Sequence, residues 1–288
     1  MSAPAKSIFG STAFKPSLPI TRGWLNLATA VEIIAMLQLY FFSESTDKFF
    51  AWTIQVPLTA AFLGAGFGAG FILVFLYRNE TLWANARVAL PGVLVFTLLT
   101  LAATIIHIDK FHIVTSDDPV AVFFSWVWLI VYAVAPIVQA LAIWKQMRAA
   151  GGEPPRAHPL PAWLKVALGF HVAVMLLIGI PLFIAPATVS PLWPWALTPL
   201  TARAVSAWLV GIGVILGHAL WENEWGRIRG GALAYAVYSL MQIIALFRFP
   251  DQILFGASFW VYVAILISGL GLGWYGWTTG QKIQRLAK

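Results

Sequence analysis

The sequence predicts an all-α integral membrane protein in which eight transmembrane helices form a tandem 4+4 repeat, with a pseudo-two-fold axis along the membrane normal. Three observations support this fold class. The 288 residues are 60% hydrophobic and only 10% charged, and the mean hydropathy of +0.82 lies outside the range of soluble domains. Apolar residues come in runs of about 20, the length that crosses roughly 30 Å of hydrocarbon. The second half of the chain also repeats a residue pattern of the first half.

Eight apolar runs are the expected spans. They lie at roughly 24–42, 57–77, 88–107, 121–145, 163–184, 199–220, 230–248 and 256–277. Pro57 and Pro199 each stand in the first turn of a span, where the missing N–H of proline costs nothing. The first 22 residues are polar, so we expect no cleavable signal peptide. The absence of cysteine excludes disulfides, thiolate nucleophiles and iron–sulfur ligation.

The net charge of +7 reflects membrane topology and predicts no nucleic-acid partner. With the N-terminus inside, only four cations fall on outer segments: Lys48, Lys110, Arg203 and Arg248. The other fourteen fall on inner segments: Lys6, Lys15, Arg22, Arg78, Arg87, Lys145, Arg148, Arg156, Lys165, Arg227, Arg229, Lys282, Arg285 and Lys288. This positive-inside distribution predicts that both termini are cytoplasmic. We expect the lipid bilayer to be that of a bacterial plasma membrane, the cell inner membrane.

One inner linker divides the chain. Residues 149–162, AAGGEPPRAHPLPA, are rich in proline, glycine and small residues. They separate a first four-helix repeat at 23–148 from a second at 163–278. Cytoplasmic segments at 1–22 and 279–288 complete the predicted organisation.

The two repeats align along most of their length. Residues 24–37, WLNLATAVEIIAML, match 163–176, WLKVALGFHVAVML, without gaps. At an offset of 142 residues, the PLTA at 57–60 recurs at 199–202. In the same register a second motif recurs: Glu80, Trp83 and Arg87 return as Glu222, Trp225 and Arg229. Because each repeat has an even number of spans, the halves share one orientation, as in transporters built from parallel repeats.

The first candidate site is an intramembrane acid and its counterpart. Glu32 lies near the centre of the first span, and the repeat alignment pairs it with His171. A charged carboxylate there costs about 2.5–3.5 kcal/mol on insertion scales, so we expect Glu32 to face protein or a polar cavity. One interpretation is a proton-linked or ligand-binding pair across the pseudo-axis. The alternative is a pair of buried polar residues that specify helix packing.

Polar stripes on two helices form a second candidate site. The third span carries Thr97, Thr100, Thr104 and His107 at helical spacing, and the seventh carries Tyr235, Tyr238, Ser239 and Gln242. Ser239 and Gln242 fall opposite Thr97 and Thr100 in the repeat alignment. The stripes either line one ligand cavity or supply interhelical hydrogen bonds worth about 0.6 kcal/mol each.

Three further features have competing interpretations. GAGFGAG at 64–70 contains a dinucleotide-like glycine spacing, but within a membrane span its small-xxx-small pairs predict close helix packing. The repeated Glu–Trp–Arg motif suits a structural helix start, or else a gate at the inner end. Arg203 has no counterpart in the first half, and it either snorkels outward or attracts an anionic ligand.

Histidines supply the alternative chemistry. His171 and His218 are candidate axial ligands for haem or a chlorophyll-type tetrapyrrole, although they lie on different helices at different depths. The outer loop HIDKFHIVTSDD has metal-type side chains, but a solvated loop explains it better.

The leading hypothesis is binding or transport of a small solute, ion or lipid at the interface between the repeats. The alternative is a non-transporting subunit of a membrane complex, with haem, a chlorophyll-type tetrapyrrole or quinone as its candidate cofactors. A homo-oligomer is compatible with either hypothesis. No nucleophile or catalytic metal motif occurs, so an enzyme is the weakest of the three classes. The ligand and any cofactor stay unknown at this stage.

Overall fold

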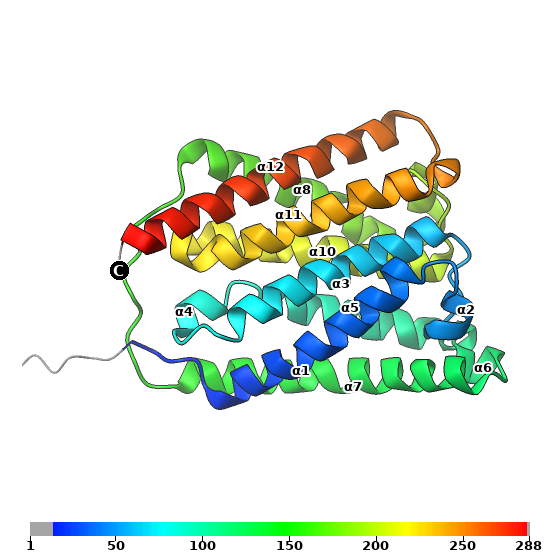
Figure 1. Cartoon of the computed structure of the whole chain (residues 1–288), viewed down its shortest axis with the longest axis horizontal. Coiled ribbons are helices and arrows are strands. Elements are labelled where there is room, and N and C mark those ends of the chain that lie inside the picture. Colours follow the sequence, from blue (N-terminus) through cyan, green and yellow to red (C-terminus); the bar gives the residue numbers. More distant parts are fainter. Residues whose placement is uncertain (1–13, 287–288) are drawn as a thin grey trace, which may run out of the picture.

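The structure, a computed structural model that describes residues 14–286, is all-helical within that range (Figure 1). Its long helices are α1 (Pro19–Met36, extended by the π-helix η1, Leu37–Phe41), α3 (Pro57–Tyr77), α5 (Leu90–Ile106), α7 (Pro119–Arg148), α8 (Ala162–Ile184), α10 (Pro199–Glu222), α11 (Trp225–Arg248) and α12 (Ala257–Leu286). Short helices connect them: α2 (Thr46–Phe49), α4 (Trp83–Ala86), α6 (His112–Thr115), α9 (Pro186–Val189) and the 3₁₀ turns η2 (Ile108–Lys110), η3 (Ser190–Leu192) and η4 (Pro250–Gln252). Lys6 and Lys288, two of the predicted inner cations, lie outside the described residues.

Seven of the described helices are long and apolar enough to cross a membrane, so the chain is a multi-pass helical membrane protein. The exception among the eight expected spans is α5, which has 17 residues and a length of about 26 Å. By contrast, α7 and α12 each have 30 residues and are longer than predicted. Hydropathy locates the apolar part of a helix, while hydrogen bonding lets the helix continue into the interface. The start of α11 at Trp225 instead of residue 230 has the same cause.

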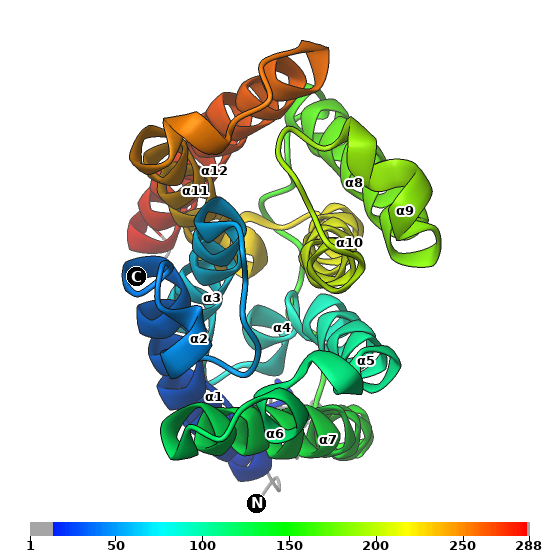
Figure 2. The same cartoon turned by 90° about the vertical axis from the view of Figure 1, so that its right-hand side faces the viewer.

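The long helices form two layers of four (Figure 2). In one layer the packing order is α1, α3, α11 and α12, and in the other it is α7, α5, α10 and α8. Each layer therefore takes two helices from each half of the chain. The helices α3 and α10 are the most deeply buried of the candidate spans. Both described chain ends lie at one end of the bundle, beside α4 (Figure 1).

Small residues of α3 allow the close packing. A Cβ atom on Gly64 would lie 2.5 Å from the backbone nitrogen of Tyr40, at the crossing of α1 and α3. A Cβ on Gly66 would lie 2.6 Å from the indole ring of Trp208 on α10. Both distances are too short for any side chain, which agrees with the packing interpretation of GAGFGAG.

Candidate functional site

The carboxyl group of Glu32 lies inside the bundle, as the sequence predicts for an intramembrane acid. Its Oε2 atom is buried and has no hydrogen-bond partner. The carboxyl lies against Gly70 of α3, where a Cβ atom would collide with it. Gly70 thus provides the space that lets an acid on α1 reach past α3. A buried carboxyl oxygen without a hydrogen-bond partner has a high desolvation cost in a membrane span. This cost marks the position as a candidate site.

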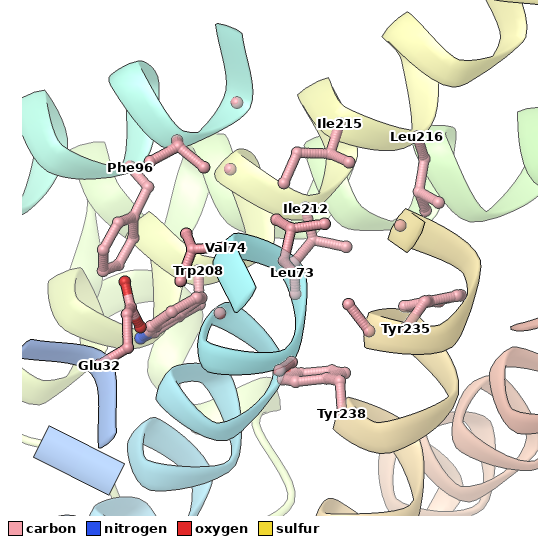
Figure 3. A pocket seen from close by; sticks show the side chains of 17 residues that line it. Glu32, Leu73, Val74, Phe96, Trp208, Ile212, Ile215, Leu216, Tyr235 and Tyr238 are labelled. Carbon is pink, nitrogen blue, oxygen red and sulfur yellow. The ribbon is translucent and has the colours of Figure 1, made fainter. Parts of the chain in front are cut away.

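Glu32 forms part of the wall of a central cavity of about 70 Å³ between the two helix layers (Figure 3). The helices α3 and α11 form one side, and α5 and α10 form the other. In Figure 3 the carboxyl points toward the rings of Phe96 and Trp208, and Tyr235 and Tyr238 lie across the cavity. The other labelled side chains are aliphatic. The cavity is therefore an apolar space with one acidic group on its wall.

A second cavity, of about 180 Å³, meets Glu32 from the first half of the chain. It lies between α1, α3, α5 and α7 and shares Glu32 and Phe96 with the central cavity. Its lining includes the side chains of Leu27, Ile130 and Val134, which are also exposed on the apolar outer surface. The cavity consequently reaches the membrane-facing surface between α1 and α7.

His171, the repeat counterpart of Glu32, is buried and fully hydrogen-bonded. Its Nδ1 lies 2.6 Å from the hydroxyl of Tyr235, and its Nε2 lies 3.1 Å from the Oγ of Ser268 on α12. Tyr235 lines the central cavity, so it lies between that cavity and the imidazole. With both ring nitrogens engaged inside the protein, His171 makes no direct hydrogen bond to Glu32.

The histidine geometry does not favour the tetrapyrrole interpretation. An axial ligand needs a ring nitrogen that faces open space, and both nitrogens of His171 are engaged. The Nδ1 of His218 lies 2.9 Å from the carbonyl oxygen of Val88, a bond that ligating histidines also make. Its Nε2, the nitrogen left for a ligand, lies 3.7 Å from the buried carboxylate of Glu222, and its ring stacks on Trp221. Within residues 14–286, no three metal-type side chains gather in one place. His112, which the sequence places in a solvated loop, is in fact buried and bonded to Phe50 and Thr53.

The two polar stripes face different surroundings. On α5, the hydroxyl of Thr97 donates to Gln139 of α7 at 3.1 Å, and Thr104 accepts from the indole of Trp128 at 3.0 Å. On α11, the amide of Gln242 donates to a carbonyl of α3 and accepts from Tyr262 of α12. These bonds join neighbouring helices. Three other residues of the predicted stripes have buried hydroxyl groups without a hydrogen-bond partner: Thr100, Tyr238 and Ser239.

The repeated Glu–Trp–Arg motif forms ion pairs between the halves at the end of the bundle that holds the chain ends. Arg87 binds Glu222 with two guanidinium nitrogens, and Arg229 binds Glu80. Burial disfavours the charge of Arg87, but its hydrogen bonds to Glu222 and Glu153 prevail and raise its pKa. Glu222 is fully buried, and Arg227 also donates to it at 2.6 Å.

At the opposite end, a guanidinium nitrogen of Arg203 lies 2.8 Å from the Nε2 of His107. Burial and the positive charge of Arg203 lower the pKa of His107, so the imidazole is neutral at pH 7 and accepts this hydrogen bond. Arg203 therefore neither extends freely outward nor has an anionic partner among the described residues.

Sequence reasoning missed Trp208 and Gly70 as parts of the Glu32 site. A signal for Trp208 was available, because it lies in the middle of a span, whereas the indoles of membrane proteins favour the interface. Gly70 was singled out only for helix packing. The buried Arg227 was counted only as one of the inner cations.

Comparison of the chain with protein-family models, curated protein sequences and solved structures finds no match.

Proposed function

We propose that the two halves of the chain are repeats related by a two-fold axis along the bundle. The main support comes from the ion pairs. Glu80 and Arg87 correspond to Glu222 and Arg229 at an offset of 142 residues. Arg87 binds Glu222 and Arg229 binds Glu80, so one contact is made twice in opposite directions. Reciprocal contacts of this kind are characteristic of an isologous two-fold interface.

Other contacts follow the same rule. Gly66 and Trp208 are equivalent at this offset and touch each other, as residues beside a two-fold axis do. The backbone N–H groups of Trp83 and Trp225 each donate at 3.1 Å to the segment that precedes the first helix of a half. On this basis all eight long helices, including α5, cross the membrane.

The end with the ion pairs is the cytoplasmic end of this proposal. Fourteen of the eighteen Lys and Arg residues belong to that side, in the pattern typical of a bacterial plasma membrane protein. Both chain termini are then cytoplasmic.

The function supported best is binding of a small amine with an apolar body at Glu32, which lines both the central cavity between the halves and the larger cavity of the first half. The observation that carries this proposal is the buried Oε2 without a partner on the wall of an apolar cavity. A carboxyl oxygen accepts hydrogen bonds, and a buried charge is stable only when it is paired, so the matching ligand group is an ammonium. The cavity beside it measures about 180 Å³, and a cavity of roughly 150 Å³ already holds benzene.

Transport extends this proposal. Repeat-built transporters bind their ligand between two halves and rock the halves around the site. Here the reciprocal ion pairs hold the halves together at the cytoplasmic end, so the bound ligand would leave toward the cytoplasm only when these pairs separate. Neither a tetrapyrrole nor a quinone is favoured by a specific contact of the described residues.

Binding of 4-fluorobenzylamine, followed by ¹⁹F NMR on the purified protein in nanodiscs, tests the proposal. We expect saturable binding that Glu32→Gln weakens about ten- to a hundredfold, because a charged hydrogen bond is worth about 1.5–3 kcal/mol. The matched probe is 4-fluorotoluene, which lacks the amine and should bind both proteins equally. Equal affinity of the amine for both proteins would refute the role of Glu32.

Uptake of the same amine into proteoliposomes tests transport. We expect accumulation that Glu32→Gln abolishes. Binding without uptake would reduce the proposal to a ligand-binding subunit.

A further inference from the structure

The second half of the chain contains a larger cavity that the amine proposal does not use. Its volume is about 420 Å³, and it lies between α8, α10, α11 and α12. Its walls are almost entirely apolar, with Ile178 of α8 and Ile265 of α12 on two sides. Trp193 and Pro194, in the connection after η3, also line it. The cavity is thus more than twice as large as the one beside Glu32.

This cavity also reaches the outer surface of the bundle. Three of its lining side chains are strongly exposed: Leu177 is 74% exposed, Leu192 71% and Val261 55%. They lie on α8, on η3 and on α12. Because α8 packs mainly on α10 and α12 packs mainly on α11, the two helices leave an apolar opening between them. In a multi-pass membrane protein this opening faces lipid tails.

Unsatisfied hydrogen-bond donors are the second observation at this cavity: the indole of Trp193 near its rim and the hydroxyl of Tyr238 on its inner side. Trp193 is only 6% exposed, and its indole Nε1–H is buried with no acceptor among the described residues. The neighbouring indole of Trp195 donates to Thr59, and the hydroxyl of Tyr262 donates to Gln242, so both of these polar groups are satisfied. A buried donor without an acceptor has lost its hydrogen bonds to water without replacement, which is unfavourable. The cavity therefore suits a ligand that brings an acceptor.

We infer that this cavity binds an acyl chain of a bilayer glycerolipid, whose ester carbonyl accepts the hydrogen bond from Trp193. The apolar walls match the methylene chain, and the exposed rim allows entry from the bilayer. An ester carbonyl has acceptor lone pairs and no donor, which complements the indole. Trp193 follows α9 and η3 in the chain, and α9 lies at the end of the bundle opposite the chain ends (Figure 2). In the proposed orientation this end meets the outer membrane interface, where the ester groups of lipids lie. This ligand chemistry is the reverse of that at Glu32, where the protein supplies the acceptor.

Photo-crosslinking tests this site. The protein is reconstituted in phosphatidylcholine nanodiscs that contain a fraction of phosphatidylcholine with a diazirine in the acyl chain, and adducts are mapped by peptide mass spectrometry. We expect adducts concentrated at 174–181 on α8 and 257–266 on α12. Adducts spread evenly over all exposed apolar residues would overturn the site.

Two variants on α8 make a matched pair. Leu177→Trp fills the opening and should reduce the adducts on α12 at least fivefold. Val166→Trp makes the same change at a position that is 73% exposed but does not line the cavity, and it should leave the adducts unchanged. Both side chains face outward, so neither variant disturbs the core. Equal adducts in the two variants would contradict the proposal.

Trp193→Phe tests the hydrogen bond separately. In the natural protein, ester-linked lipid should compete with the photoreactive lipid several-fold better than its ether-linked analogue, which lacks the carbonyl. In Trp193→Phe the two competitors should be equal. A preference for ester lipid that survives this change, or crosslinks to a second copy of the chain in place of lipid adducts, would refute the assignment. Glu32 variants should leave all of these results unchanged, so a negative result for the lipid proposal and a negative result for the amine proposal can be told apart.

Discussion

The two halves of the chain place different polar groups at one equivalent position, and they treat them differently. In the second half, both nitrogens of His171 are hydrogen-bonded, to Tyr235 and Ser268. In the first half, the carboxyl of Glu32 has an oxygen with no partner. A satisfied polar group rigidifies a membrane core, whereas an unsatisfied one persists only at an energetic cost. The comparison favours a structural role for His171 and is consistent with the ligand-binding role proposed for Glu32.

The aromatic residues beside these positions extend the comparison. Phe96 in the first half and Tyr238 in the second are equivalent at the offset of 142 residues. Phe96 lines both the central cavity and the first-half cavity, and Tyr238 lines both the central cavity and the second-half cavity. Each ring thus separates the centre of the bundle from the cavity of its own half.

The largest expected effect distinguishes the two ion pairs. Glu222→Gln leaves Arg87 and Arg227 without their buried partner, and we expect the free energy of unfolding to fall by about 3–5 kcal/mol. Glu80→Gln should lose only about 1–3 kcal/mol, because Glu80 is partly exposed and mainly has Arg229 as its cationic partner. Unfolding in mixed micelles titrated with SDS measures both values. Asp109→Asn, at an exposed ion pair, is the control and should change stability by less than about 0.5 kcal/mol. A larger loss of unfolding free energy in Glu80→Gln than in Glu222→Gln would contradict this ranking of the two ion pairs.

The second prediction compares His171 with Glu32 directly. His171→Leu removes the hydrogen-bond partner of the buried Tyr235 hydroxyl, whereas Ser268 keeps its bonds to the carbonyls of Ala264 and Ile265. The change should destabilise the protein by about 1–3 kcal/mol. Glu32→Leu removes a polar group that has an unsatisfied oxygen, so stability should change little or increase. The same SDS titration measures both. If Glu32→Leu destabilises as much as His171→Leu, the carboxyl has a structural partner and the functional contrast is lost.

The third prediction concerns the space beside Glu32. Gly70→Ala forces a methyl group against the carboxyl, and overpacking of this kind costs about 1–3 kcal/mol. In a Glu32→Ala background the collision disappears, so Gly70→Ala should be nearly neutral there. A double-mutant cycle on thermal unfolding gives the coupling free energy directly. Additive effects would mean that Gly70 does not accommodate the acid. The equivalent position in the second half is Ile212, which already carries a large side chain.

The smallest expected effect is a pH dependence of stability that arises at His107, at the end of the bundle opposite the ion pairs. The folded state lowers the pKa of His107 through burial and Arg203, so the unfolded chain takes up a proton first as the pH falls below about 6.5. Stability should then decrease between pH 7 and pH 5.5, by less than about 1 kcal/mol because the side chain is partly exposed. The thermal midpoint of His107→Gln should lack this dependence. Phe249, the equivalent residue in the second half, cannot titrate, so a slope that survives in His107→Gln must come from another group.

Sequence patterns predicted the helices well because hydropathy reports membrane burial directly. The span predicted at 57–77 coincides with α3, and the one predicted at 163–184 differs from α8 by one residue. The length of α5 was not predictable in the same way, since Val88 and Ala89 belong to the apolar run but lie in a turn before the helix. An apolar run indicates which residues lie in the membrane, but it does not indicate at which residue the helical backbone hydrogen bonds begin or end.

The candidate site was predictable only in part. The cost of an acid in a membrane predicts that Glu32 faces inward, and the repeat alignment identifies His171 as its counterpart. The sequence could not reveal that Tyr235 and Ser268 satisfy the imidazole, because these partners lie 64 and 97 residues away on other helices. The motif at Glu80 and Glu222 was noticed, but its exchange of partners between halves depends on how α3 packs on α11 and α5 packs on α10.

On the proposed duplication, the exchanged partners also explain which positions are free to diverge. Glu80 and Glu222 each depend on an arginine of the other half, so a change in one copy disrupts a bond that both copies need. Glu32 and His171 share no such bond, and one copy can change chemistry while the other keeps the helices in place. Mutual dependence at the end of the bundle that holds the ion pairs, and independence in the middle, would allow one half to specialise without loss of the shared scaffold.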